Sequence, residues 1–167
     1  MIRALASRRL ELVLALLVVV LDQLTKAGVR TSFELYETMS VIPGFLNLTR
    51  VHNTGAAFGM LGSVEFPFKP VVLTAVGVLA LVGIAWYISV VPEHERLTRA
   101  GVACIAGGAI GNLIDRVRAG YVLDFVDAYW SGWHFWAFNV ADAAITVGVG
   151  LMILDMLRVG RRVPDTV

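Results

Sequence analysis

Hydrophobic residues along the chain gather in four long runs separated by more polar segments. The clearest run, residues 70–91, contains no charged residue. A helix of that length would extend roughly 33 Å, which is enough to cross the hydrocarbon of a bilayer. The other runs, residues 10–29, 97–117 and 138–158, have a suitable length but each includes polar residues. The pattern predicts four transmembrane helices.

Two segments, residues 30–69 and 118–137, connect the ends of these runs and should lie outside the bilayer. Residues 45–51 are rich in strand-forming side chains and follow a proline–glycine turn signal, which favours a short strand or hairpin. Residues 121–136 are strongly aromatic, which is typical of a belt at the membrane interface. We expect residues 1–167 to form one mainly α membrane domain.

Composition agrees with a membrane location and narrows the function. Only 16% of the residues are charged and 57% are hydrophobic, against about 25% charged in an average soluble domain. The net charge is +1 and the basic residues form no patch, so nucleic-acid binding is not expected. Cys104 is the single cysteine, and the three histidines lie in no ligand pattern. We therefore expect neither a metal nor a cofactor.

Basic residues indicate the orientation of the helices. Eight of the 14 lie in the N-terminal tail, the 92–99 link and the C-terminal tail, which four spans place on one side. They are Arg3, Arg8, Arg9, Arg96, Arg99, Arg158, Arg161 and Arg162. The positive-inside rule predicts that this side, with both termini, is cytoplasmic. No small-x-small cleavage site follows the first run, so we expect it to be retained as a span and not removed as a signal peptide.

With this topology, polar residues from three different runs reach the same depth, toward the outer leaflet. They are Asp22, the group at residues 112–116 and Asp142. Insertion of one charge into a bilayer costs about 2.5–3.5 kcal/mol, so such residues are functional candidates. Asn112 with Arg116, and Asp22 with Lys26, have the i, i+4 spacing that places two side chains together on a helix.

Asp124 and Asp142 are candidates for a pair of acidic groups. The 17 residues between them can fold Asp124 back over Asp142. Two neighbouring carboxyls share a proton near neutral pH, and such a pair can activate water for peptide hydrolysis. Other interpretations remain open at this point: helix capping or an interfacial charge for each aspartate, a small proton-coupled transporter that uses Asp142, or a structural membrane subunit.

Five sequence blocks, in this order, resemble the lipoprotein signal peptidases (signal peptidase II). The blocks are Leu21-Asp-Gln-Leu-Thr-Lys26, Asn53-Thr-Gly-Ala-Ala-Phe58, Gly107-Gly-Ala-Ile-Gly-Asn-Leu-Ile-Asp-Arg116, Val122-Leu-Asp-Phe125 and Phe138-Asn-Val-Ala-Asp142. The resemblance implies an aspartic membrane endopeptidase with four spans and a small extracytoplasmic β-rich cradle. Such enzymes cut bacterial prolipoproteins just before the cysteine that carries diacylglycerol.

Carried over to this chain, the resemblance makes Asp124 and Asp142 the catalytic pair. The residues expected to support the site or bind substrate are Asp22, Lys26, Asn53, Gly55, Asn112, Arg116 and Asn139. Two positions depart from the family pattern: His52 stands where an aromatic residue is common, and Ala143 where serine is frequent. The resemblance further implies a monomer in the bacterial inner membrane, in contact with lipid, with its active site toward the outer leaflet.

Overall fold

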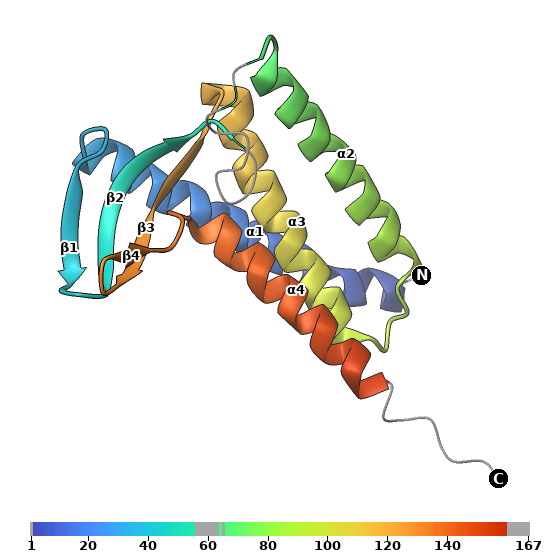
Figure 1. Cartoon of the computed structure of the whole chain (residues 1–167). Coiled ribbons are helices and arrows are strands. Elements are labelled where there is room, and N and C mark those ends of the chain that lie inside the picture. Colours follow the sequence, from blue (N-terminus) through green and yellow to red (C-terminus); the bar gives the residue numbers. More distant parts are fainter. Residues whose placement is uncertain (1, 56–63, 65, 160–167) are drawn as a thin grey trace.

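The computed structural model describes residues 2–55, 64 and 66–159, which form four long helices and a small antiparallel sheet (Figure 1). The helices are α1 (Ile2–Ser32), α2 (Lys69–Val90), α3 (Arg96–Ala119) and α4 (Val140–Val159). The strands are β1 (Thr38–Ile42), β2 (Leu46–Asn53), β3 (Val122–Trp130) and β4 (Trp133–His134). The predicted fold class is confirmed.

All four helices contain a stretch long and apolar enough to cross a membrane. These stretches are Arg9–Ser32, Lys69–Val90, Arg96–Ala119 and Val140–Leu157, and each includes a window with a mean hydropathy of 1.4 or more. Large apolar side chains are exposed along them, for example Leu12 on α1 and Leu79 on α2, each 69% exposed. Such surfaces are stable only against lipid. The protein is a multi-pass membrane protein.

Several helix ends differ from the ranges that hydropathy indicates, and α1 begins at Ile2, well before residue 10. Helix α1 extends to Ser32, beyond residue 29. Helix α4 begins at Val140, two residues after the start of the apolar run at residue 138. Phe138 is held outside the helix because it pairs with strand β3: its backbone N–H donates to the Val126 carbonyl at 3.0 Å, and its own carbonyl accepts from Val126 at 2.8 Å.

Helix α3 lies centrally and contacts each of the other three helices. Its glycines make this close packing possible, as a small-residue face predicts. A Cβ atom on Gly107 would meet the Ala15 carbonyl oxygen of α1 at 2.7 Å, and a Cβ on Gly108 would clash with the Ala141 carbonyl oxygen of α4. Backbones of α1 and α4 therefore pack directly on α3, with no room for a side chain.

The strands form one antiparallel sheet in the order β1-β2-β3-β4. Strand β2 pairs with β3, and this pairing places Val51 opposite Asp124. The strand predicted at residues 45–51 is confirmed as β2. A small core of Val29, Leu123 and Phe125 joins the end of α1 to the sheet. This packing fixes the position of β3 relative to the helices.

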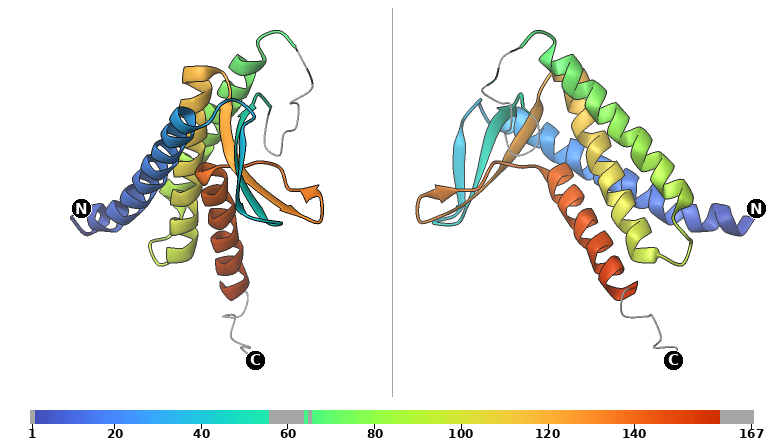
Figure 2. Two further views of the ribbon diagram at one scale, coloured as in Figure 1. Left: turned by 90° about the vertical axis from the view of Figure 1, so that its left-hand side faces the viewer. Right: turned by 45° about the vertical axis from the view of Figure 1, so that its right-hand side comes forward.

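The sheet lies at one end of the helices, while the N-terminus and the α2–α3 connection lie at the other end (Figure 2). Strand β3 leads from α3 into the sheet, and the link after β4 returns the chain to α4. The ends of α1, α3 and α4 that face the sheet are the ones that contain the polar residues singled out above.

The α3–α4 contact allows a test of the packing. We expect Gly108→Ala to destabilise the protein by about 1–3 kcal/mol, because the added methyl group overpacks the contact with Ala141. Thermal unfolding in detergent measures the change. Gly150→Ala is the matched control, since a Cβ at Gly150 meets nothing within 4 Å. Equal melting temperatures for both variants would contradict the close packing.

Candidate active site

Asp124 and Asp142 line the same cavity, which has a volume of about 750 Å³. Asp124 lies in strand β3 and is 2% exposed. Asp142 lies in the first turn of α4. The cavity extends from these carboxyls along α4 to Ile145 and Val147. It thus joins a polar end, at the sheet, to an apolar surface on a membrane helix.

Both oxygens of the Asp124 carboxyl accept a hydrogen bond from an asparagine amide. Oδ2 accepts from Asn53 Nδ2 at 2.9 Å and Oδ1 accepts from Asn139 Nδ2 at 2.7 Å. Burial, together with the nearby Asp142 carboxyl, raises the pKa of Asp124 from 3.8 to about 7, although the two amides oppose the shift. A carboxyl with this pKa can carry a proton near neutral pH.

Asn139 connects the two carboxyls through a capping box at the start of α4. Its Oδ1 accepts from the backbone N–H of Asp142 at 2.9 Å, and the Asp142 carboxylate accepts from the backbone N–H of Asn139 at 3.3 Å. The same side chain donates to Asp124 through Nδ2. The local signal that begins the helix therefore also fixes Asp124 and Asp142 relative to one another.

Asn112 and Arg116 reach the cavity from α3, one turn apart, as their spacing predicts. Asn112 Nδ2 donates to Asp142 Oδ1 at 2.8 Å. The Arg116 guanidinium donates to the Gly55 carbonyl at 2.7 Å, and the Gly55 N–H donates to Asn53 Oδ1 at 2.9 Å. Helix α3 thus contacts Asp142 directly, and it also holds Gly55, which binds the Asn53 side chain that contacts Asp124.

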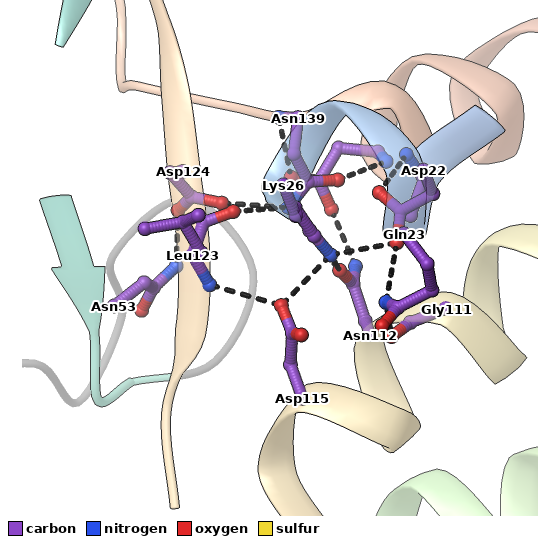
Figure 3. A network of polar contacts seen from close by, with 12 residues as sticks. Asp22, Gln23, Lys26, Asn53, Gly111, Asn112, Asp115, Leu123, Asp124 and Asn139 are labelled. Atoms are coloured by element: carbon purple, nitrogen blue, oxygen red, sulfur yellow. Dashed lines mark hydrogen bonds and ion pairs between the residues drawn. The ribbon is translucent and has the colours of Figure 1, made fainter. Parts of the chain in front are cut away.

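A buried ion cluster of Lys26, Asp22 and Asp115 is part of the same network of polar contacts as Asp124 and Asn139 (Figure 3). The Lys26 ammonium, fully buried, contacts Asp22 Oδ2 at 2.8 Å, Asp115 Oδ2 at 3.0 Å and Asn112 Oδ1 at 3.0 Å. The Asp22–Lys26 pair expected from the sequence is therefore present. Asp22 Oδ1 also accepts from the backbone N–H of Ala141 at 3.0 Å, directly before Asp142.

All nine predicted site residues thus belong to one connected set of contacts. The cavity wall includes Asn53, Asn112, Arg116, Asp124 and Asp142. Asn139 and the Asp22–Lys26 pair lie behind it, and Gly55 is held by Arg116. The remainder of the Asn53–Phe58 block, residues 56–58, lies outside the described residues. Among the described residues, no group of three or more potential metal ligands is present.

Comparison with known proteins identifies a family over most of the chain. The family model described as Signal peptidase (SPase) II matches residues 14–158. The chain belongs to this family. It is an aspartic-type peptidase, and the comparisons give no support to the transporter alternative.

Relatives of this peptidase share most of its length. The lipoprotein signal peptidase of Syntrophotalea carbinolica is 45% identical over 95% of this chain and 97% of its own. That of Symbiobacterium thermophilum is 44% identical over 92% of this chain and 97% of its own. A solved structure described as a bacterial membrane enzyme at 2.3 Å resolution has a TM-score of 0.82 and 31% identity, covering 94% of this chain and 93% of that chain.

Sequence reasoning left Asp115 out of the site, although the structure makes it part of the ion cluster. Its Oδ2 contacts Lys26 and also accepts from the Leu123 backbone N–H at 3.1 Å, while Oδ1 accepts from Arg30 at 2.5 Å. Asp115 thereby fixes the residue next to Asp124. The available signal was a carboxylate in the same helix turn as Asn112 and Arg116.

Another contact that the sequence did not reveal involves Gln23, which lies beside the predicted Asp22. Its amide donates to Asp22 Oδ2 at 3.1 Å and to the Gly111 carbonyl at 3.2 Å. A Cβ atom on Gly111 would come within 2.5 Å of Asp22 Oδ2. Gly111 therefore leaves the space that the Asp22 carboxylate occupies.

The ion cluster predicts a large effect at Asp115. Asp115→Asn leaves Lys26 and Arg30 with one carboxylate fewer, and breaking a buried pair typically destabilises by about 3–5 kcal/mol. We expect a clearly lower melting temperature in detergent. Glu34→Gln, at an exposed position after α1, is the control and should leave it unchanged. An unaltered Asp115→Asn protein would show that the cluster does not stabilise the fold.

Proposed function

We propose that Asp124 and Asp142 are the catalytic pair of this peptidase. Its substrates are prolipoproteins, and it hydrolyses the peptide bond just before the cysteine that carries diacylglycerol. One observation carries this proposal: two carboxyls with a common hydrogen-bond partner, Asn139, face one cavity that continues along a membrane helix. The names of the relatives, lipoprotein signal peptidases, agree with this substrate class.

The two carboxyls have different environments, which suggests different roles. Asp142 lies at the N-terminus of α4, where the helix dipole and the backbone N–H of Asn139 favour a negative charge. Asp124 has a pKa of about 7 and can hold the proton. Asp142 then accepts a proton from a water molecule as the water oxygen bonds to the carbonyl carbon of the substrate. Asp124 donates a hydrogen bond to the carbonyl oxygen. When the C–N bond breaks, the proton that Asp142 took from water passes to the leaving amine nitrogen, and Asp142 is again a carboxylate.

The shape of the cavity suits a substrate that is anchored in a membrane. Near the carboxyls it is polar, and farther along it is bordered by Phe138, Ile145 and Val147, the last being 57% exposed. Lipid chains and an apolar signal peptide can thus remain among apolar side chains while the peptide bond reaches Asp124 and Asp142. Access from the lipid side avoids moving the acyl chains into water.

The supporting residues have positioning roles in this proposal. Lys26 and Asp22 hold α1 against the start of α4, and Asn112 and Asn139 orient the carboxyls. Asn53 fixes Asp124, and Arg116 with Gly55 holds the neighbouring backbone. We infer one integral-membrane domain that acts as a monomer, with lipid around its exposed apolar helices.

Location and orientation are part of the same proposal. The active site faces the outer leaflet of the bacterial inner membrane, and both termini are cytoplasmic. The N-terminus and the α2–α3 connection lie at the end opposite the sheet (Figure 1), and this end carries Arg96 and Arg99. The positive-inside rule supports a cytoplasmic position for that end. Arg161 and Arg162, which the sequence argument also used, lie outside the described residues.

Substitution of either carboxyl tests the proposal. We expect Asp124→Asn and Asp142→Asn each to lower kcat by about 10²–10⁴-fold or more, because an amide can neither accept nor supply the transferred proton. The assay follows cleavage of a diacylglyceryl-modified prolipoprotein in detergent. Asp127→Asn is the matched control, since Asp127 lies on the same strand but contacts His134 and Asn47, away from the cavity. Full activity of either active-site variant would overturn the assignment.

The raised pKa of Asp124 predicts the pH dependence of the reaction. Below about pH 7 Asp124 is protonated, as the mechanism requires, and above about pH 7 it loses this proton. We therefore expect kcat/KM to fall as the pH rises, approaching tenfold per pH unit on the basic side. A pH–rate profile of the purified enzyme measures this. Constant kcat/KM up to pH 9 would contradict the proton-donating role of Asp124.

A further inference from the structure

Asp124 borders a second cavity in addition to the main one. This smaller cavity has a volume of about 280 Å³. Its lining comes from the end of β2 with the loop after it, from Asp124, and from Trp136 and Ala137 in the link before α4. Among the described residues, no residue of a membrane helix lines it, whereas the main cavity is bordered by α3 and α4.

The position of Asp124 between two cavities suggests how a substrate crosses the site. Under the proposed function, the cleaved bond lies at Asp124 and Asp142. The signal peptide before the bond is apolar and belongs with the membrane helices that border the main cavity. The chain after the lipidated cysteine is the secreted protein and must reach water. The described lining of the smaller cavity comes from strand and link residues, which suits a chain segment that leaves the membrane helices.

We propose that the smaller cavity binds the substrate residues that follow the lipidated cysteine, and that His52 is a specificity-determining residue there. This inference rests on the proposed function, because it takes the cleaved bond to lie at Asp124.

The His52 side chain is fixed in place but has an unused polar group. Its ring stacks on Tyr121 with centroids 3.7 Å apart and an interplanar angle of 18°. The ring nitrogen Nε2 is shielded from water and has no hydrogen-bond partner among the described residues. A buried polar atom without a partner is unfavourable. A peptide that turns the ring as it binds in the cavity would supply that partner.

The charge state of His52 indicates what kind of group it would bind. Burial and the nearby Arg50 and Arg30 lower the pKa of His52 below its usual 6.5, so the imidazole is neutral at pH 7. A neutral imidazole has one donor and one acceptor nitrogen. It therefore fits a backbone amide or an uncharged polar side chain of the substrate.

Two substrates of different length provide the test. Both contain the same signal sequence and diacylglyceryl cysteine, but one ends at that cysteine as an amide and the other continues for four uncharged residues. His52→Phe keeps an aromatic ring against Tyr121 and removes both ring nitrogens. We expect it to raise KM for the longer substrate roughly three- to tenfold, the loss of about one hydrogen bond. Its kcat, and both constants for the shorter substrate, should remain as in the wild type.

A second variant and a control make the result independent of any one substitution. Thr54→Trp fills the same cavity from an exposed position, and it should also raise KM for the longer substrate alone. His94→Phe changes an exposed histidine in the α2–α3 connection and should alter neither substrate. Melting temperatures in detergent verify that each variant is folded.

The outcomes separate this inference from the proposed function. If His52→Phe and Thr54→Trp leave KM for the longer substrate unchanged, or change both substrates equally, the smaller cavity does not bind the residues after the cysteine. If wild-type enzyme cleaves neither substrate, or if Asp124→Asn cleaves both at the wild-type rate, the proposed function itself is wrong.

Discussion

The buried ammonium of Lys26 is the constraint on which the rest of the site depends. A charge in the interior of a membrane protein must be neutralised locally, because neither lipid nor a dry core can solvate it. Asp22 from the same helix supplies one carboxylate and Asp115 from α3 supplies another. These carboxylates then bind backbone N–H groups of Ala141 and Leu123, which are the neighbours of Asp142 and Asp124. Neutralisation of one lysine thus positions both catalytic candidates.

The two aspartates lie in different local structures, although both line the same cavity. Asp142 begins a helix, where its charge is favoured by the dipole and by backbone N–H groups. Asp124 lies in a strand, buried and close to Asp142, and its pKa is raised for that reason. Asn139 contacts both, so the helix start and the strand cannot shift independently. The proposed acid and base are thus held together, and the described residues contain no group of three or more potential metal ligands.

The arrangement of cavities relates the protein fold to a substrate that is partly in lipid and partly in water. The larger cavity reaches an exposed apolar part of α4, while the smaller one is bounded by strand and link residues. The sheet supplies residues of the site: strand β3 contributes Asp124, and β2 contributes its hydrogen-bond partner Asn53. Asn53 and Asp124, from this strand pair, line both cavities.

Much of this protein was determined by local sequence. Hydropathy fixed the four spans, because a bilayer demands about 20 apolar residues for each helix. The i, i+4 spacing of Asp22 and Lys26 fixed their pairing, and the ordered blocks identified the family. The roles of Asp115 and Gln23 could not be read in the same way, since their partners lie on other helices. The start of α4 at Val140 could not be predicted either, because Phe138 pairs with strand β3. Tertiary structure alone decided that Asp124 and Asp142 line one cavity, because Asn53, Asn112 and Asn139, which are distant in sequence, hold the two carboxyls there.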